Sequence, residues 1–273
     1  MKLKLLKIFL YIFSRPVFFT FFYTLNKVCL NAMNRTAASQ FSPECTGEKA
    51  AFKYALLKLI NTNKLIIFDC GGNLGYYSKS IIEVCNTAQV NFDLFIFEPS
   101  NFCYTCLQKI FGSSKNIKLH KLAVSDLNSS AKLYYPWKGS GGASLCKIVS
   151  EVQIQSSLEQ ISEDINTVKM DDFCAQNAIE KIDFLKLDIE GFELLALQGA
   201  SQMLTNRKIK FIQIEIGTAA LATKFMLFDA WKMLNGLYCF YLILNQGLFE
   251  IKDYKSDLEC FYGASNFLLE LRN

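Results

Sequence analysis

A glycine-rich segment, Asp69-Cys70-Gly71-Gly72-Asn73-Leu74-Gly75, continues from a short apolar run, and an acidic residue, Glu98, ends the next such run. Glycines let the backbone turn tightly and approach a ligand closely, and a helix that begins after them presents free N–H groups. An acid at the end of a strand is well placed to accept both hydroxyls of a ribose. Together these residues predict a site for a nucleoside-containing cofactor.

The charge of Asp69 discriminates between two kinds of cofactor. A loop that holds a pyrophosphate favours positive potential, and a carboxylate two residues before the first glycine works against it. A cofactor with an amino group and a sulfonium favours the opposite, because Asp69 can pair with the ammonium directly or through water while Glu98 binds the ribose. These residues therefore favour S-adenosylmethionine. The alternative is that Asp69 and Asn73 only cap the following helix and that Glu98 is a solvated strand end.

Seven short apolar runs are the strand candidates that would position these residues. Helical patterns lie between most of the early runs, and this alternation predicts an α/β fold with a mostly parallel seven-stranded sheet and helices on both faces. Ligands bind beyond the carboxyl ends of the strands in such a sheet. Residues Lys138–Asn166 contain no obvious strand and are predicted to form a long loop or lid-like insertion. The runs are Leu65–Asp69, Leu94–Glu98, Ile117–Leu122, Phe184–Asp188, Phe211–Ile216, Phe240–Leu244 and Phe267–Leu271.

The motifs, in their order and spacing, resemble those of the FkbM-type S-adenosylmethionine-dependent methyltransferases over about residues 47–271. The resemblance implies a Rossmann-like class I methyltransferase fold, S-adenosylmethionine as cofactor, and methylation of hydroxyl groups, often on sugars or secondary metabolites. It also implies that Ser125 and Asp126 lie near the adenine. The family usually has alanine where this chain has Gly72. The matching segments are Ile67–Ser78, Phe97–Pro99, Ala123–Asp126, Met170–Asp172 and Ile182–Glu193, with Ser265–Leu268 near the end of the chain.

Three residues around the end of the fourth run are candidates for the chemistry of methyl transfer. Transfer from sulfonium to oxygen is an in-line displacement, so catalysis depends mostly on holding the acceptor oxygen about 3 Å from the methyl carbon. A hydroxyl is a poor nucleophile, and a nearby base helps to remove its proton. We predict that Asp188 is this base and that Glu190 binds the acceptor or assists. Lys186, two positions before Asp188 on the same strand face, would orient Asp188 or hold the hydroxyl oxygen.

Structural alternatives exist for the acidic residues in this part of the chain. Glu190 and Glu193 can serve as negative charges at a helix N-terminus, where they favour the macrodipole. Glu215 is either a residue of the acceptor pocket or a solvated strand end. Asp188 and Glu190 can bridge a metal, but the sequence identifies no third ligand, so no metal site is predicted.

The composition excludes several classes of protein. The chain has 273 residues, of which 51% are hydrophobic and 20% charged, so it can bury a sizeable core and is not disordered. Its ten cysteines have no regular spacing, which argues against a disulfide framework. The single histidine, His120, and the single pair Cys103 and Cys106 do not suffice for a typical zinc site or for two-histidine metal chemistry.

The positive charge is concentrated at the N-terminal end. Residues 1–43 contain six basic residues and no acidic one, so the remaining chain carries a net charge of −2 out of a total of +4. The body therefore lacks the charge of a nucleic-acid-binding surface. Residues 1–46 form a basic, apolar segment ahead of a predicted methyltransferase domain at 47–273.

Residues 1–35 contain a long apolar stretch, Ile8–Leu25, that Ser14-Arg15-Pro16 interrupts. An arginine at the bilayer centre costs about 2.5–3.5 kcal/mol, so a clean spanning helix is not expected. Three interpretations stay open: a helix at the membrane interface, a helix packed on the domain, and a cleaved signal peptide. We favour the first, in a cytoplasmic protein that contacts a membrane surface through residues 1–35.

The sequence thus predicts an S-adenosylmethionine-dependent O-methyltransferase that acts on a hydroxyl of a carbohydrate, glycolipid or small metabolite. A nicotinamide-dependent oxidoreductase is the alternative enzyme, although Asp69 and the lack of a Tyr-Lys or His catalytic pattern count against it. A non-catalytic, membrane-tethered binding module with a methyltransferase-like fold is the alternative outside enzymes. Such a module would not bind the cofactor, or would keep its function when Asp188 is replaced.

Overall fold

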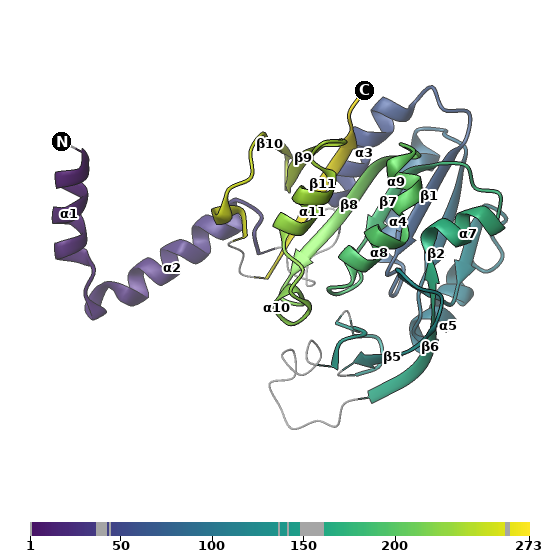
Figure 1. The fold of residues 1–273 in the computed structure, drawn as a ribbon, viewed down its shortest axis with the longest axis horizontal. Helices are drawn as coiled ribbons and strands as arrows, with labels where there is room; N and C mark the ends of the chain where they lie inside the picture. Colours follow the sequence, from purple (N-terminus) through teal and green to yellow (C-terminus); the bar gives the residue numbers. More distant parts are fainter. Residues whose placement is uncertain are drawn as a thin grey trace.

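The computed structural model describes all residues except 1, 37–42, 44, 136, 141, 148–160 and 260–262. Within the described chain the main sheet has eight strands in the order β10-β9-β11-β8-β7-β1-β2-β3 (Figure 1). The five strands from β3 to β8 are parallel, and β11, β9 and β10 are added by antiparallel pairing. The predicted α/β fold with a mostly parallel sheet is confirmed. The strands are β1 (Leu65–Cys70), β2 (Phe92–Phe97), β3 (Ile117–His120), β7 (Ile182–Leu187), β8 (Ile209–Gly217), β9 (Tyr238–Leu244), β10 (Gly247–Ile251) and β11 (Ala264–Leu271).

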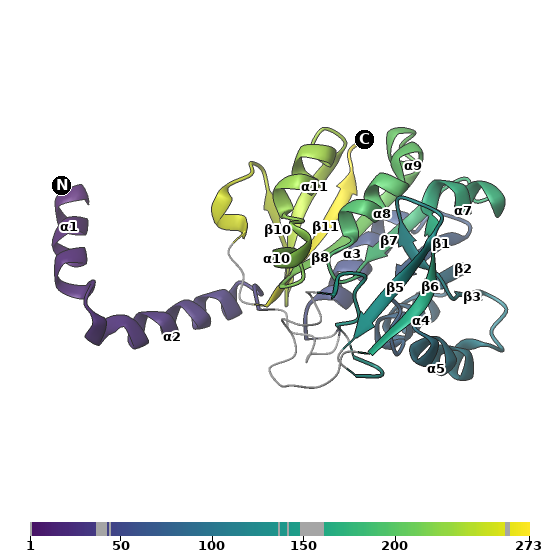
Figure 2. The same ribbon diagram turned by 60° about the horizontal axis from the view of Figure 1, so that its bottom comes forward.

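The central strands are continuous apolar runs because helices cover both faces of the sheet. The helices α3 (Glu48–Leu59), α4 (Tyr76–Thr87) and α5 (Asn101–Phe111) contribute side chains to the core on one face. The helices α7 (Met170–Gln176), α8 (Glu193–Gly199), α9 (Ser201–Thr205) and α11 (Leu227–Leu234) contribute to the core on the other face. The result is a three-layer domain (Figures 1 and 2). Two short helical elements, α10 (Ala220–Thr223) and η1 (Ser256–Glu259), complete the described helices.

The register of the sheet aligns the ends of three strands. Strand β1 lies between β2 and β7, so that Asp69 pairs with Ile96 on one side and with Lys186 on the other. The next pairs join Cys70 to Phe97 and to Leu187. Because all three strands are parallel, the residues that follow them meet at one edge of the sheet.

Two sequence expectations need correction. The main sheet has an eighth strand, β10, which forms a hairpin with β9; its five residues include only three apolar ones, too few to stand out as a run. The predicted loop Lys138–Asn166 contains the start of β6 (Ile161–Lys169), which forms a second sheet with β4 (Ala123–Ser125) and β5 (Ser130–Tyr135). Residues 141 and 148–160 of that expectation lie outside the described residues.

The strand β6 was missed because only one of its faces is buried. Ile165 and Thr167 are buried, while the intervening Asn166 and the preceding Asp164 are exposed. A strand with one solvated face alternates polar and apolar residues and shows no continuous apolar run. The sequence prediction relied on continuous apolar runs and therefore did not identify this strand.

The N-terminal residues form two helices, α1 (Lys2–Phe13) and α2 (Pro16–Ala32), that project from the domain (Figures 1 and 2). The expectation of a helix packed on the domain is wrong for both helices except the end of α2, where Leu30 is buried. Just beyond α2, the side-chain amide of Asn34 donates hydrogen bonds to the carbonyls of Thr46 and Ile243. No helix in the described parts of the chain is long and apolar enough to cross a membrane.

Candidate active site

The loop between β1 and α4 joins the three aligned strands through its backbone. The N–H groups of Gly71 and Gly72 both donate to the carbonyl of Phe97, and the N–H of Asp188 donates to the carbonyl of Cys70. Gly71 has φ +90°, and a Cβ there would overlap the carbonyl oxygen of Asp188. Only glycine therefore fits at Gly71 without moving the backbone after β7.

The residue Gly72, where the family usually has alanine, has an ordinary φ. A Cβ at this position would overlap Cγ2 of Ile96, a side chain of the neighbouring strand β2. The branched side chain of Ile96 thus occupies the space that a side chain at position 72 would need. The constraint at Gly72 comes from packing, whereas the constraint at Gly71 comes from the backbone.

The carboxylate of Glu98 is held by the backbone of two loops. Its Oε2 accepts the N–H of Asn73 at 2.8 Å, and its Oε1 accepts the N–H of Ser100 at 2.9 Å. The side chain is only 5% exposed, and burial raises its pKa to about 7 although both backbone hydrogen bonds lower it. Glu98 thus connects the glycine loop to the start of α5.

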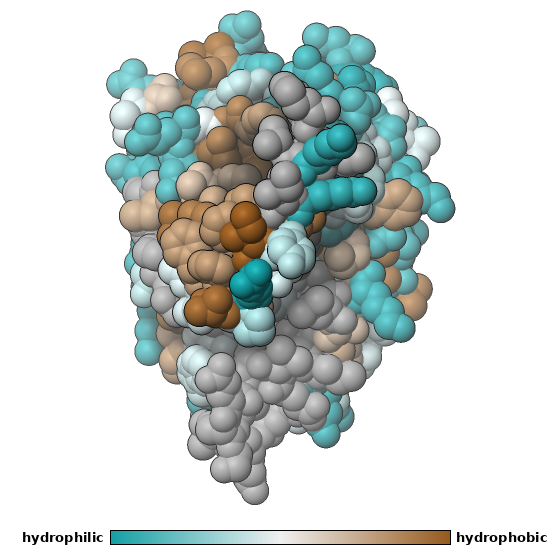
Figure 3. Space-filling model, turned by 90° about the vertical axis from the view of Figure 1, so that its left-hand side faces the viewer, coloured by the Kyte–Doolittle hydropathy of each residue, from teal (hydrophilic) through white to brown (hydrophobic). Residues whose placement is uncertain are grey.

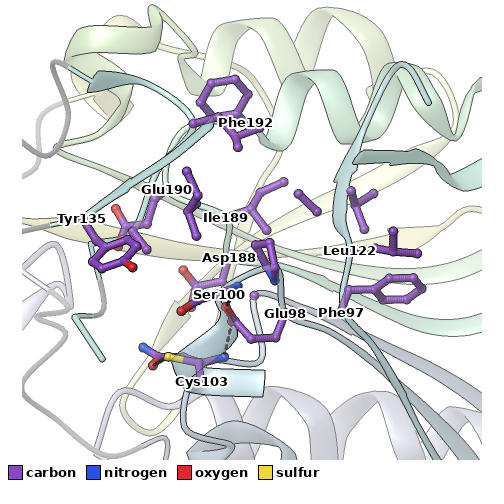
Figure 4. Close-up of a pocket in the computed structure, with 18 of the residues that line it drawn as sticks. Phe97, Glu98, Ser100, Cys103, Leu122, Tyr135, Asp188, Ile189, Glu190 and Phe192 are labelled. Carbon is purple, nitrogen blue, oxygen red and sulfur yellow. Dashed lines mark hydrogen bonds between the residues drawn. The ribbon is translucent and has the colours of Figure 1, made fainter. Parts of the chain in front are cut away.

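Glu98 borders a first cavity, which lies beyond the ends of β1, β2 and β7. The cavity is open to solvent, and its empty space, part of which is that solvent, is about 790 Å³. Figure 4 shows Phe97 and Leu122 at one end, Tyr135 and Glu190 at the other, and Glu98 and Asp188 between them. One end of the first cavity is therefore apolar, and the other end carries carboxylates.

The residue Asp69 does not line this cavity. Its side chain is fully buried beneath the glycine loop, where Oδ2 accepts the hydroxyl of Ser78 at 2.5 Å. Its Oδ1 has no hydrogen-bond partner among the residues that the structure describes. Burial raises the pKa of Asp69, and the nearby Lys186 acts in the opposite direction. The expected direct pairing with a bound ammonium is not supported by this position, whereas contact through a water stays a prediction.

The structure does not bring Ser125 and Asp126 to the first cavity. The Ser125 hydroxyl donates to the carboxylate of its neighbour Asp126 at 3.0 Å. The Ser125 carbonyl lies so close to Gly199 of α8 that a Cβ on this glycine would overlap it. The cavity is instead lined by the three preceding residues, Leu122–Val124, because β4 begins at Ala123 and leads away from it.

A second cavity adjoins the first and shares the walls formed by Gly71, Asp188 and Glu190. Of the further residues that line it, the most polar are charged or amide side chains from four different elements. They are Glu48, Lys186, Glu215 and Asn266. The three predicted catalytic residues, Lys186, Asp188 and Glu190, are therefore brought together, and two of them face both cavities.

The side chain of Lys186 is the cation at the centre of this cavity wall. It is 3% exposed, its Nζ donates to Oδ2 of Asp188 at 2.7 Å, and it lies 4.5 Å from the ring centroid of Tyr77. Burial by itself lowers the pKa of Lys186, but the surrounding carboxylates of Asp188, Glu48 and Asp69 raise it overall. Lys186 is therefore charged at neutral pH.

The carboxyl groups of Asp188 and Glu215 have pKa values that are shifted in opposite directions. Burial alone raises the pKa of Asp188, but Lys186 and a hydrogen bond from Glu215 lower it overall. Burial and the charge of Asp188 raise the pKa of Glu215 well above its usual range. At neutral pH the geometry thus fits an ionised Asp188 that accepts hydrogen bonds from Lys186 and from a protonated Glu215.

The acidic residues after β7 have separate positions. Oε1 of Glu193 accepts the N–H groups of Ile189 and Gly191, so Glu193 holds the turn before α8. Glu190 has φ +53°, an uncommon conformation for a residue other than glycine, and its side chain lines both cavities. Carboxylate oxygens of Asp188, Glu190 and Glu215 lie within 4.8 Å of one another, so Glu215 is the neighbour that the sequence did not identify as a potential third ligand.

Several residues of the second cavity were missed by the sequence analysis. Glu48, at the start of α3, is buried and accepts the Thr46 hydroxyl at 2.6 Å and the Gln213 side-chain amide at 2.7 Å. The hydroxyl of Tyr77, which also lines the cavity, donates to the side-chain oxygen Oε1 of Gln213 at 2.8 Å, so Gln213 connects the two residues from behind the cavity wall. A sequence signal existed only for Gln213, a polar residue inside an apolar run.

The sequence matches a family model and a known relative. A sequence model of the Methyltransferase FkbM domain matches residues 69–239. The 2-O-methyltransferase NoeI of Sinorhizobium fredii (strain NBRC 101917 / NGR234) is 26% identical over 174 residues, which cover 59% of this chain and 66% of NoeI. The match thus spans just under two thirds of that relative.

Two solved structures are similar to this chain at low sequence identity. The methyltransferase domain of METTL16 has a TM-score of 0.37 and 10% identity, covering 80% of this chain and 65% of that one. A protein of Listeria monocytogenes described as a class I S-adenosylmethionine-dependent methyltransferase has a TM-score of 0.39 and 13% identity, covering 86% and 61%. Membership of the FkbM family implies S-adenosylmethionine as the cofactor. The resemblance seen in the motifs is confirmed, and the chain belongs to the FkbM methyltransferase family.

Proposed function

We propose that the protein transfers the methyl group of S-adenosylmethionine to a hydroxyl oxygen of a small-molecule or glycan acceptor, such as a carbohydrate, glycolipid or small metabolite. The observation that carries this proposal is the position of Asp188, whose carboxylate lies in the shared wall of two cavities. The first cavity suits a nucleoside, and the second cavity is lined by charged and amide side chains. The name of NoeI, a 2-O-methyltransferase, supports oxygen as the accepting atom.

The first cavity fits the cofactor on three counts. Glu98 uses one lone pair of each oxygen for the backbone, which leaves acceptor capacity for the two hydroxyls of a ribose. Leu122 and Val124 provide an apolar surface for an adenine ring. The unpartnered Oδ1 of Asp69 beneath the loop suits a positively charged neighbour reached through water. When bound, S-adenosylmethionine supplies an activated methyl group.

In the second cavity Asp188 would accept the proton of the acceptor hydroxyl. Lys186 fixes one oxygen of Asp188, and Glu215 donates a hydrogen bond to the same carboxylate. Such a held carboxylate orients the hydroxyl, so that its oxygen faces the methyl group, and takes up the proton as the new C–O bond forms. Glu190 and Asn266 offer further hydrogen-bond partners for hydroxyls. Trp137 adds an aromatic surface, 56% exposed, at the same cavity.

The cofactor is tested first, by calorimetric titration of the full chain with S-adenosylhomocysteine and, as control, with NAD. We expect binding of S-adenosylhomocysteine only, and weaker binding by Glu98→Gln. Binding of NAD alone would support the nicotinamide-dependent alternative. A folded sample that binds neither ligand would support the non-catalytic alternative.

Methyl transfer is tested next, with radiolabelled S-adenosylmethionine and a panel of sugars, glycolipids and hydroxylated metabolites. We expect Asp188→Asn to lose transfer while it still binds S-adenosylhomocysteine. The exposed Asp164→Asn is the matched control and should keep full activity. Full transfer by the double variant Asp188→Asn, Glu190→Gln would refute the catalytic assignment.

A further inference from the structure

The helices α1 and α2, which we call the N-terminal arm (residues 2–32), expose more apolar surface than a water-facing element normally does. Every described side chain of the arm before Leu30 is at least partly exposed. Figure 3 shows apolar side chains gathered on the face that carries the arm, with hydrophilic ones beside them. A large, contiguous apolar surface of this kind marks a contact with another molecule. Its most exposed large members are Leu10, Tyr11, Val17, Phe19, Phe21 and Val28.

Aromatic contacts give the arm a defined shape. Phe9 and Phe13 of α1 pack against Phe22 of α2 with ring centroids 6.1 Å apart, and Phe13 packs against Phe18 at 5.2 Å. These rings fill the inner side of the bend between the helices. The exposed side chains named above take no part in these contacts between the two helices, so they remain to be covered.

The charge of the arm distinguishes between two possible partners, a second copy of the chain and a lipid surface. The arm contains five basic residues, Lys2, Lys4, Lys7, Arg15 and Lys27, and no acidic one. A second copy of the chain would bring an equally positive segment against the first, which is unfavourable. Anionic lipids would instead attract each lysine or arginine near the surface. We propose that the N-terminal arm binds the surface of an anionic lipid bilayer.

The arrangement of the cations suits helices that lie in the interface. Lys4 and Lys7 precede the apolar end of α1, Arg15 separates the two helices, and Lys27 lies over the ring of Tyr23 near the end of α2. Each helix thus has charges at its ends and apolar or aromatic side chains between them. Phenylalanine and tyrosine rings then insert at the headgroup boundary while the cations stay at the lipid phosphates.

The base of the arm lies close to the second cavity. Asn34 donates to the carbonyl of Thr46, and Thr46 and Pro43 line that cavity. The side chain of Arg35 is buried, donates to the carbonyl of Leu258 and lies over the ring of Phe267. These contacts hold the end of α2 on the domain, so binding of the arm to a bilayer would bring the second cavity near the lipid surface.

The test is co-sedimentation of the full chain with vesicles of phosphatidylcholine alone or mixed with phosphatidylserine. We expect binding to the anionic vesicles only, and weaker binding as salt increases. The double variant Phe19→Ser, Phe21→Ser should bind at least tenfold more weakly because less apolar surface is inserted. The double variant Lys4→Gln, Lys7→Gln should lose about fivefold per lysine.

The control variant is Phe249→Ser, which removes a ring of similar exposure from β10 and should bind as the parent does. Unchanged circular dichroism and melting temperature will show that the arm variants are folded. Equal binding to neutral and anionic vesicles, or no binding to either, would overturn the proposal. A concentration-dependent dimer in sedimentation velocity that the arm variant loses, without vesicle binding, would assign the surface to a second copy.

Discussion

In the first cavity Glu98 is held by two backbone N–H groups, whereas in the second cavity Asp188 is held by the side chain of a buried lysine. Glu98 is buried and Asp188 is partly exposed, and their pKa values move in opposite directions. Burial raises that of Glu98 to about 7; for Asp188 burial acts in the same direction, but Lys186 and Glu215 lower the pKa overall.

This contrast shows what each kind of partner contributes. Backbone donors position a carboxylate precisely but carry no net charge, so they offset burial only in part. A buried cation supplies a full charge that acts to lower the pKa of each neighbouring carboxyl group, and at Asp188 it outweighs burial. In the first cavity the key carboxylate is therefore positioned by backbone hydrogen bonds. In the second cavity it is positioned by the charge of Lys186, the common neighbour of several carboxylates. Four changes, taken from the largest expected effect to the smallest, test this distinction.

Replacing Lys186 with methionine should have the largest effect. The change leaves the carboxylates of Asp188, Asp69 and Glu48 without their common cation, and breaking a buried ion pair typically costs about 3–5 kcal/mol. We expect the free energy of unfolding at pH 8, measured by urea denaturation, to fall by an amount of this order. Lys132→Met, which removes an exposed ion pair with Asp164, should cause no measurable change. A similar loss in both variants would contradict this role of Lys186.

Neutralising Asp188 should affect methyl transfer far more than neutralising Glu215. Asp188→Asn removes the proton acceptor, and positioned general bases contribute about 10²–10⁴-fold to rates. Glu215→Gln replaces a protonated carboxyl with an amide that can still donate a hydrogen bond, so we expect less than a tenfold loss. Single-turnover rates with saturating S-adenosylmethionine will measure both. Equal losses would mean that Glu215, not only Asp188, is ionised in the active enzyme.

The two neighbouring glycines should respond differently to alanine. Gly71→Ala places a side chain at φ +90° against the Asp188 carbonyl, in the wall of both cavities, and we expect a loss of about 1–3 kcal/mol. Gly72→Ala meets only the side chain of Ile96 and should cost less. Urea denaturation and titration with S-adenosylhomocysteine will compare the variants. If Gly72→Ala is the more damaging, the loop is constrained by packing and not by the backbone.

The smallest effect concerns the pH dependence of stability. Because the pKa of Glu98 rises from 4.5 to about 7 on folding, the folded state binds more protons than the unfolded state in this window, and this residue makes stability fall as pH increases from about 4.5 to 7. Glu98→Gln should reduce the downward slope by at most about 1.4 kcal/mol per pH unit. Unfolding at pH 5, 6 and 7 will measure the slope. The exposed Glu83→Gln is the control, and an unchanged slope in Glu98→Gln would refute the assignment.

The parts of the site that lie close together in the sequence were predictable. The glycine loop, Glu98 and the group Lys186, Asp188 and Glu190 all follow buried strands, and parallel strands bring their carboxyl ends to one edge. Local pattern and one topological rule were enough to place these residues together. The position of Ser125 and Asp126 near the adenine stays a prediction. Neither residue lines the first cavity, because β4 begins at Ala123, a boundary that no periodicity marks.

The remaining residues could be found only in three dimensions. Glu48 begins a helix and Asn266 lies on an antiparallel strand, more than 200 positions apart in the chain, yet both face the second cavity. Glu48 has no neighbours in sequence that indicate chemistry, and the family match at Ser265–Leu268 gave Asn266 no role. Their meeting depends on how α3 packs on the sheet and on the insertion of β11 between β8 and β9.

The sequence alone determined the fold class, the family, the glycine loop and the positive, apolar character of the N-terminal segment, because these follow from residue type, spacing and charge. Only the tertiary structure decided that Asp69 lies beneath the loop, that Glu215 shares a proton with Asp188, and that the arm projects from the domain. The physical reason is that burial and charge coupling depend on distances between residues far apart in the chain, which periodicity does not encode.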